Sequence, residues 1–121
     1  MEQDQKFQRK YAELNPYCEI QMAFRREFLA RDDIHEILHG SSRTFEDWNM
    51  IALTRENHNR YHLKTEKDGG IPRRIFFIAK IINGTLKNCP DDIVRRFRLG
   101  LLIRNEEKFR RRWLIHVYHK I

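Results

Sequence analysis

The sequence has little of what would place a protein outside the cell or in a membrane. It contains two cysteines, Cys18 and Cys89, among 121 residues, which suits a reducing compartment and argues against a disulfide framework. No apolar run approaches the ~18 residues that span a bilayer. The polar start, MEQDQKFQRK, does not read as a secretory signal peptide, and there is no internal repeat or low-complexity tract. We therefore expect a cytoplasmic protein with no membrane contact.

What the sequence does contain is positive charge, and that charge is unevenly placed. The net charge is +7, yet Met1–Leu63 holds 9 Lys or Arg against 11 Asp or Glu. Lys64–Ile121 holds 15 against 6. The whole positive excess thus lies in the second half, an asymmetry that predicts contact with a polyanion, nucleic acid above all.

The first half predicts a mixture of helices and short strands. A helix over 4–14 would end at Asn15-Pro16. Apolar residues at steps of four favour a second helix over 19–30; they are Ile20, Phe24 and Phe28. The segments 32–38 and 48–54 are typical of short strands and are joined by a polar, turn-like stretch.

The second half predicts helices. Thr54 is placed to cap a helix that begins at Arg55 and runs to about residue 67, where Asp68-Gly69-Gly70 stops it. Further helices are expected from Pro72 to about Gly84, after Pro90, and from about Asn105. The expected class is α+β, with one unit over 1–68 and a basic helical extension over 71–121.

One short motif suggests a protease. Residues His35, Glu36 and His39 spell H-E-x-x-H, in which two histidines one helical turn apart hold zinc and the glutamate acts as general base. Gly40-Ser41-Ser42 follow at once, however, and glycine there usually ends a helix. A small zinc hydrolase therefore stays an alternative only.

A second pattern gives His35 different partners. Asn49 is followed by His58 and His62 in the arrangement N-x8-H-x3-H. On a helix from Arg55 the two histidines lie at i and i+4 on one face, where they can chelate one metal ion. If the two strands pair as a hairpin and this helix packs across it, His35 is brought to the same point, with Asn49 close by.

At these residues the chain resembles the HNH nucleases of the His-Me finger (ββα-metal) superfamily, in particular small phage-type proteins. The resemblance covers about 18–63 and implies a ββα-metal core. It also implies an endonuclease that hydrolyses phosphodiester bonds in DNA, of phage or mobile-element origin, which acts in the bacterial host cell if a phage encodes it. Asn49 would orient His35 or pin the loop through backbone hydrogen bonds. His58, His62 and in one alignment His35 would hold one divalent ion. The sequence does not distinguish Mg, Mn, Zn and Ni as its identity.

The base that activates water is left open by the resemblance. One alignment makes His35 a metal ligand and Glu36 the water-activating group. A one-residue shift makes His35 the general base, with Asp33 as a candidate ligand. Neighbouring strand residues point to opposite faces, so His35 and Glu36 are not expected in one site unless the strand is distorted.

Many HNH domains also carry a zinc knuckle of two C-x2-C pairs. Cys18 stands at the first position, but the others are occupied by Gln21, Thr54 and Asn57. One thiol cannot build a four-ligand structural site, so no structural zinc is expected.

The basic half supplies the expected DNA contacts. Arginines cluster twice near the C-terminus, at Arg95, Arg96, Arg98, Arg110, Arg111 and Arg112. They suit phosphate contacts with little choice of base sequence, and the same helices are candidates for a homodimer interface. The alternative to a nuclease is a non-catalytic nucleic-acid-binding module on the same fold.

Overall fold

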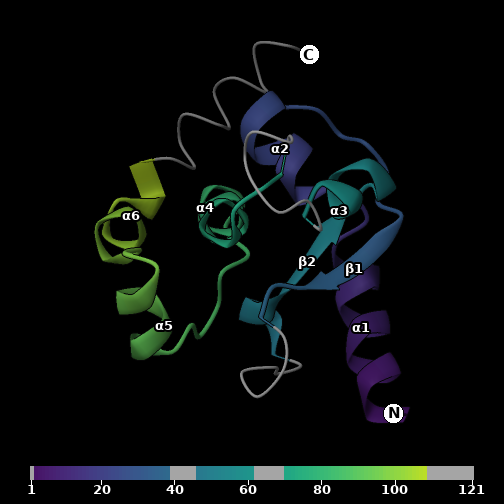
Figure 1. Ribbon diagram of the computed structural model, residues 1–121, viewed down its shortest axis with the longest axis horizontal. Coiled ribbons are helices and arrows are strands. Elements are labelled where there is room, and N and C mark those ends of the chain that lie inside the picture. The colour runs from purple at the N-terminus through teal and green to yellow at the C-terminus, as the bar shows by residue number, and fades with distance from the viewer. Residues whose placement is uncertain (1, 39–45, 62–69, 109–121) are drawn as a thin grey trace.

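The computed structural model describes residues 2–38, 46–61 and 70–108. In this part of the chain the architecture is α+β, with a two-stranded sheet among helices. In Figure 1 the central helix α4 lies between the sheet and the pair α5 and α6. The elements, in order, are α1 (Glu2–Leu14), α2 (Glu19–Arg25), β1 (Asp33–Glu36), the 3₁₀ turn η2 (Asp47–Asn49), β2 (Met50–Leu53), α3 (Arg55–Tyr61), α4 (Arg73–Asn83), α5 (Asp91–Arg96) and α6 (Gly100–Arg104).

The first two helices agree with the sequence in place but not in length. α1 ends at Leu14, as predicted, but α2 ends at Arg25 rather than near residue 30. Arg26 takes a left-handed conformation (φ 57°), and the N–H of the next residue, Glu27, donates to the Gln21 carbonyl at 3.2 Å, which closes the helix. The step of four that suggested a longer helix was misleading, because Phe24 and Phe28 are about half exposed.

The two strands form an antiparallel pair in which His35 lies opposite Ile51. They are shorter than the predicted segments 32–38 and 48–54. Residues 47–49 form a 3₁₀ turn instead of the start of the second strand. All four residues of β2 are buried, which explains why that strand reads as an apolar run without alternation.

A single residue, Thr54, joins β2 to α3. Its hydroxyl accepts a hydrogen bond from the Asn57 N–H at 3.3 Å, the capping contact that the sequence predicted. The predicted continuation of this helix to residue 67 lies outside the described residues.

The core forms where α4 packs against α2 and the sheet. α4 begins after Pro72 and ends at Gly84, whose φ of 74° suits glycine. Its Phe76 and Phe77 are fully buried. They join an apolar cluster contributed by both halves of the chain, which includes Cys18, Ile20, Ile37, Trp48, Ile51, Leu53, Ile81, Ile93 and Leu99.

In the C-terminal part of the chain, α5 was predicted and α6 was not, and the helix predicted from about Asn105 lies mostly outside the described residues. α5 follows Pro90 as expected, with acids in its first turn and arginines in its last, which suits the helix dipole. The sequence predicted no helix over 100–104, yet α6 lies there. Arg74 of α4 supports the turn between them by donating to the carbonyls of Phe97 (2.8 Å) and Arg98 (3.2 Å).

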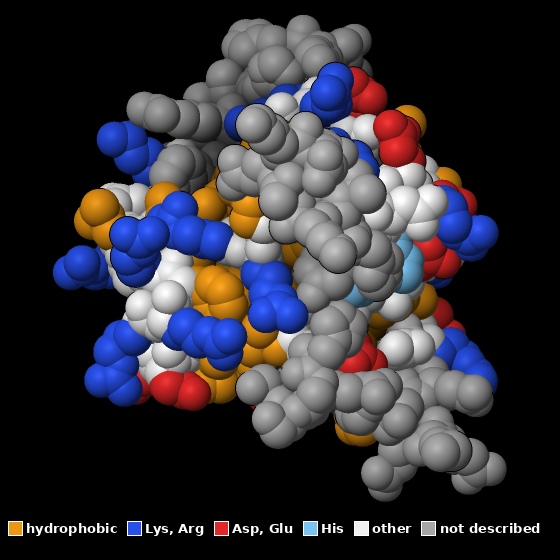
Figure 2. All heavy atoms as spheres, in the orientation of Figure 1, with side chains coloured by type: hydrophobic (Ala, Val, Ile, Leu, Met, Phe, Trp, Pro, Cys, Tyr) orange, Lys and Arg blue, Asp and Glu red, His pale blue; other side chains and the backbone are white. Residues whose placement is uncertain are grey.

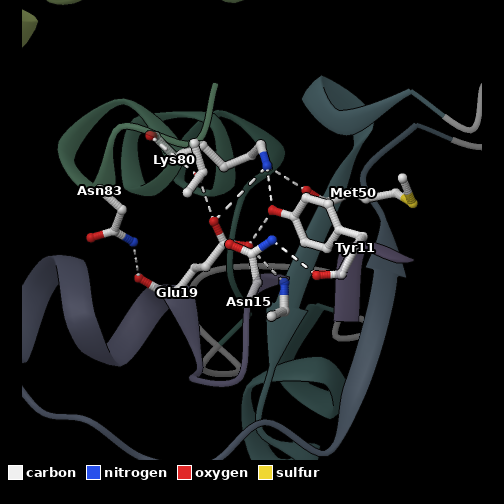
Figure 3. A network of polar contacts seen from close by, with 8 residues as sticks. Tyr11, Asn15, Glu19, Met50, Lys80 and Asn83 are labelled. Carbon is white, nitrogen blue, oxygen red and sulfur yellow. Dashed lines mark hydrogen bonds and ion pairs between the residues drawn. The ribbon is translucent and has the colours of Figure 1, made fainter. Parts of the chain in front are cut away.

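A buried polar network connects α1, α2 and α4 to β2 (Figure 3). The Lys80 ammonium, fully buried, donates to the Tyr11 hydroxyl and to the Met50 carbonyl, both at 2.6 Å. The Tyr11 hydroxyl in turn donates to Glu19 Oε2 at 2.6 Å. Lys80 Nζ lies 3.9 Å from Glu19 Oε1, and the Thr85 hydroxyl donates to that same oxygen.

Burial shifts the titration of this network. It lowers the pKa of Lys80, an effect that the Glu19 charge opposes. Burial, reinforced by Glu19, raises the pKa of Tyr11 well above its ordinary value. The phenol therefore stays neutral and can act as donor to Glu19 and acceptor from Lys80 at once.

We predict that Lys80→Met destabilises the fold by about 3–5 kcal/mol, because it leaves the Glu19 carboxylate and the Met50 carbonyl buried without their cation. The measurement is urea unfolding followed by circular dichroism. The matched control is Lys87→Met, which removes an exposed lysine two residues beyond Thr85 and should change stability by less than about 0.5 kcal/mol. Equal effects from the two substitutions would contradict a structural role for the network.

Candidate functional site

Strand alternation sorts the polar residues of β1 onto two faces. Asp33 and His35 lie on the face toward α3, where both meet His58. Ile34 lies on the other face, packed against the buried cluster of Tyr11, Met50 and Ala52. Glu36 shares that second face and accepts a hydrogen bond from Gln8 of α1 at 3.3 Å. The strand is regular, so His35 and Glu36 diverge.

His35 and His58 come together from separate elements. The centroids of the two imidazole rings are 4.8 Å apart. His35 is almost completely buried, at 3% exposure, and its ring also lies against Phe76 of α4. The side chain of His58 is 26% exposed, so the pair is reached from the His58 side. Two imidazoles this close offer nitrogen ligands suited to one divalent ion.

Asn49 fastens the start of β2 to the end of β1. Its side chain is fully buried; Oδ1 accepts from the Leu38 N–H at 2.8 Å and Nδ2 donates to the Leu38 carbonyl at 3.1 Å. The Ile37 N–H donates to the Asn49 carbonyl at 2.8 Å. Of the two roles expected for Asn49, these contacts belong to the pinning of the backbone.

Several predicted site residues lie outside the described residues. His62, the third histidine of the pattern, is one, and His39 of the H-E-x-x-H motif is another. Within the described residues, no group of three or more histidine, cysteine or acidic side chains is placed to hold a metal ion. His35 and Glu36 themselves lie in a strand, so their backbone lacks the helical spacing that a H-E-x-x-H zinc site requires.

Cys18 lies beside Asn57, which stands where the zinc-knuckle pattern has another cysteine ligand. Its buried thiol accepts a hydrogen bond from Asn57 Nδ2, with 3.4 Å between sulfur and nitrogen. Asn57 and Gln21 both line a pocket of about 430 Å³ between α2, α3 and the start of α4. A single sulfur with amide neighbours is a poor donor set for structural zinc, and the expectation of no such site stays a prediction.

The predicted phosphate-binding arginines are partly described. Arg95, Arg96 and Arg98 are exposed, on α5 and the turn after it. Arg110, Arg111 and Arg112 lie outside the described residues. Figure 2 shows lysine and arginine side chains gathered over the side of the molecule that α4, α5 and α6 form. The described arginines are thus available to a partner in solution.

One interaction at the site was not predicted from the sequence: Asp33 contacts both His58 and Arg55. Asp33 Oδ2 lies 3.1 Å from His58 Nδ1 and 3.1 Å from Arg55 Nε. The hydrogen bond from Arg55 lowers the pKa of Asp33, against an opposing effect of burial. Alternation gives the signal that was available: Asp33 stands two residues before His35 and therefore on the same face.

Comparison of the chain with protein-family models, with curated proteins and with solved structures gave no match. None of the helices in the described ranges is long and apolar enough to cross a membrane.

We predict that Asn49→Ala frees the backbone at Leu38. The Leu38 N–H and carbonyl lose their partners in a buried place, at a cost of about 1–3 kcal/mol for each group. Hydrogen exchange followed by NMR should show a large loss of protection at the Leu38 amide. Asn59→Ala is the control, because Asn59 is exposed on α3. Unchanged protection at Leu38 in Asn49→Ala would rule out the pinning role.

Proposed function

We propose that this chain is a metal-dependent endonuclease of the HNH type, with a ββα-metal core, that cleaves phosphodiester bonds in DNA. The observation that carries the proposal is the meeting of His35 and His58, from β1 and α3, beside a loop that Asn49 pins. An antiparallel strand pair followed at once by a helix is the order that the N-x8-H-x3-H pattern predicted.

Each residue has a stated part in the proposed reaction. His58 and His62 would hold the divalent ion, and His35 would take the proton from the attacking water. Imidazole has an ordinary pKa near neutrality, which suits a general base. The ion, when bound, would stabilise negative charge on the phosphate and on the leaving oxygen. Asn49 ties the start of β2 to the end of β1, so that His35 stays beside His58.

Glu36 is the weaker candidate for the base. It lies on the face of β1 that carries Ile34, and Gln8 donates to its carboxylate. The proposal therefore makes His35 the group that activates water and assigns Glu36 no chemical step. The alternative role of His35, as a ligand of the ion, is tested below.

The partner is proposed to be a nucleic acid because of the exposed arginines beyond the core, and DNA because the family resemblance implies it. Arg95, Arg96 and Arg98 are close in sequence and point charge into solvent. The neighbouring Arg74 is occupied by backbone carbonyls and is not proposed as a contact. Such a surface would bind the phosphate backbone irrespective of base sequence.

One observation favours a second candidate, a non-catalytic nucleic-acid-binding module on the same fold. His35 is only 3% exposed and packs against Phe76, as an internal packing residue would. In that case the chain would bind DNA with every divalent ion and cleave with none.

We predict that the protein nicks supercoiled plasmid in the presence of Mg²⁺, Mn²⁺, Ni²⁺ or Zn²⁺. His35→Ala should lower the rate by about 10²–10⁴-fold, the usual contribution of a positioned acid or base. His58→Ala and His62→Ala should also lower it, because each removes a proposed ligand of the ion. Glu36→Gln is the matched control, since it keeps the size of the side chain and should keep most of the activity.

Calorimetric titration of the ion separates the two roles of His35. If His35 is the base, His35→Ala binds the ion as the wild type does but does not cleave. If it is a ligand, affinity for the ion falls as well. Wild-type protein that binds DNA but cleaves with none of the four ions would overturn the proposal and favour the binding module.

We also predict that binding to duplex DNA weakens with salt through the arginines of α5. The triple substitution of Arg95, Arg96 and Arg98 by Gln should reduce the slope of log K against log salt by about 0.9 for each arginine that contacts a phosphate. The control removes three exposed charges from α1 by changing Lys6, Arg9 and Lys10 to Gln. An equal change in slope from both triple variants would show only a general effect of net charge.

A further inference from the structure

A carboxylate at the site has contacts that define a role for it. Asp33 Oδ2 lies 3.1 Å from Nδ1 of His58. Asp33 stands on the same face of β1 as His35, so its side chain approaches the His58 ring from the strand. The side chains of Asp33 and His58 are 23% and 26% exposed, which makes their contact less screened by water than one between freely exposed groups.

This contact determines which ring nitrogen of His58 carries the proton. An ionised carboxylate can only accept hydrogen bonds. The nitrogen that faces Asp33, Nδ1, must therefore be the donor. In the neutral imidazole the lone pair is then on Nε2, the nitrogen on the other side of the ring.

Arg55 holds the carboxylate in place. Its Nε donates to Asp33 Oδ2 at 3.1 Å and its Nη2 donates to Asp33 Oδ1 at 3.2 Å. The backbone N–H of Arg55 donates to Asp32 Oδ2 at 2.7 Å, which fastens the start of α3 to the residue before β1. Both oxygens of Asp33 are thus engaged, and the pair of bonds to a planar guanidinium fixes the orientation of the carboxylate.

We infer that Asp33 is a positioning residue for the proposed metal site: it keeps His58 protonated on Nδ1 and presents the Nε2 lone pair to the ion. The inference rests on the proposed function and deepens it. It differs from the alternative in which Asp33 binds the ion itself: here Oδ2 contacts His58 and Arg55 and Oδ1 contacts Arg55, so the carboxylate is placed to orient the histidine.

Arg55 acts on the site indirectly, because it orients the Asp33 carboxylate that contacts His58. Metal-bound histidines commonly donate their second ring nitrogen to such a carboxylate, and loss of that partner typically weakens metal affinity by about 10–100-fold. Arg55 and Asp33 therefore belong to the functional site, although neither would touch the ion.

The first test reads the histidine tautomer in metal-free protein, where no activity is involved. The sample is labelled with ¹⁵N in histidine and held at about pH 8, above the ordinary imidazole pKa of about 6.5. The wild-type His58 signals should be those of the Nδ1–H tautomer. Asp33→Ala should move His58 toward the Nε2–H tautomer, which free imidazole side chains favour in water.

Asp32→Ala is the matched control for this experiment. It removes the neighbouring carboxylate, which bonds to the Arg55 backbone, but leaves the contact between Asp33 and His58. It should weaken the start of α3 without changing the tautomer. A tautomer change in both variants would mean that the helix end, not Asp33, sets the proton position, and would overturn the inference.

The second test measures the affinity of Mn²⁺ and Zn²⁺ for each variant by calorimetry. Asp33→Ala should weaken binding by about 10–100-fold, whereas Asp32→Ala should change it little. A wild-type His58 found as the Nε2–H tautomer overturns the role of Asp33 and leaves the proposed nuclease standing. The expected tautomer in a wild-type protein that binds neither ion overturns the metal site itself, and with it the positioning role.

Discussion

The unpaired edge of β2 is the constraint on which the rest of this structure depends. β2 bonds to β1 through alternate residues, and the carbonyls of Asn49 and Leu53 both face that partner strand. The groups of Met50 and Ala52 must therefore face away from it. Glu19 accepts from the Ala52 N–H at 2.8 Å and Lys80 donates to the Met50 carbonyl. Two side chains thus replace the strand that a larger sheet would supply at this edge.

Charged side chains make both of these bonds. Glu19 accepts from a buried N–H and Lys80 donates to a buried carbonyl, and each charge then requires the other because both lie out of water. The pair also joins α2 to α4, the helices that form the core with β2. Asn49, which fastens the proposed site, directly precedes Met50, so the network and the proposed site adjoin at the start of β2.

Much of the arrangement was predictable from local patterns, because local chemistry determines it. Thr54 caps α3 and Gly84 ends α4 where those residue types favour such conformations. The spacing of Asn49 and His58 predicted Asn49 at the second strand and His58 on the helix after it; the structure has Asn49 directly before β2 and His58 on α3. The meeting of His35 with His58 was expected from strand pairing, and the structure has these rings together.

Three features could not be predicted from the sequence, because local patterns do not determine them. The helix predicted to residue 30 ends at Arg25, because apolar spacing cannot tell a buried face from exposed phenylalanines. α6 went unpredicted, since its five residues carry too little periodicity. Glu19 and Lys80 look like ordinary surface residues in the sequence. Their 61-residue separation in the chain hides a pairing that only packing creates.

The central claim is that His58 binds a divalent ion beside His35, which activates the attacking water. A crystal structure with anomalous scattering from bound Mn²⁺ or Zn²⁺ tests this claim most directly. The account predicts a single ion at the Nε2 nitrogen of His58, at about 2.0–2.1 Å for zinc, on the side of the ring away from Asp33 and beside His35. An ion bound instead through Glu36 and His39, or full occupancy at sites remote from both rings, would contradict it.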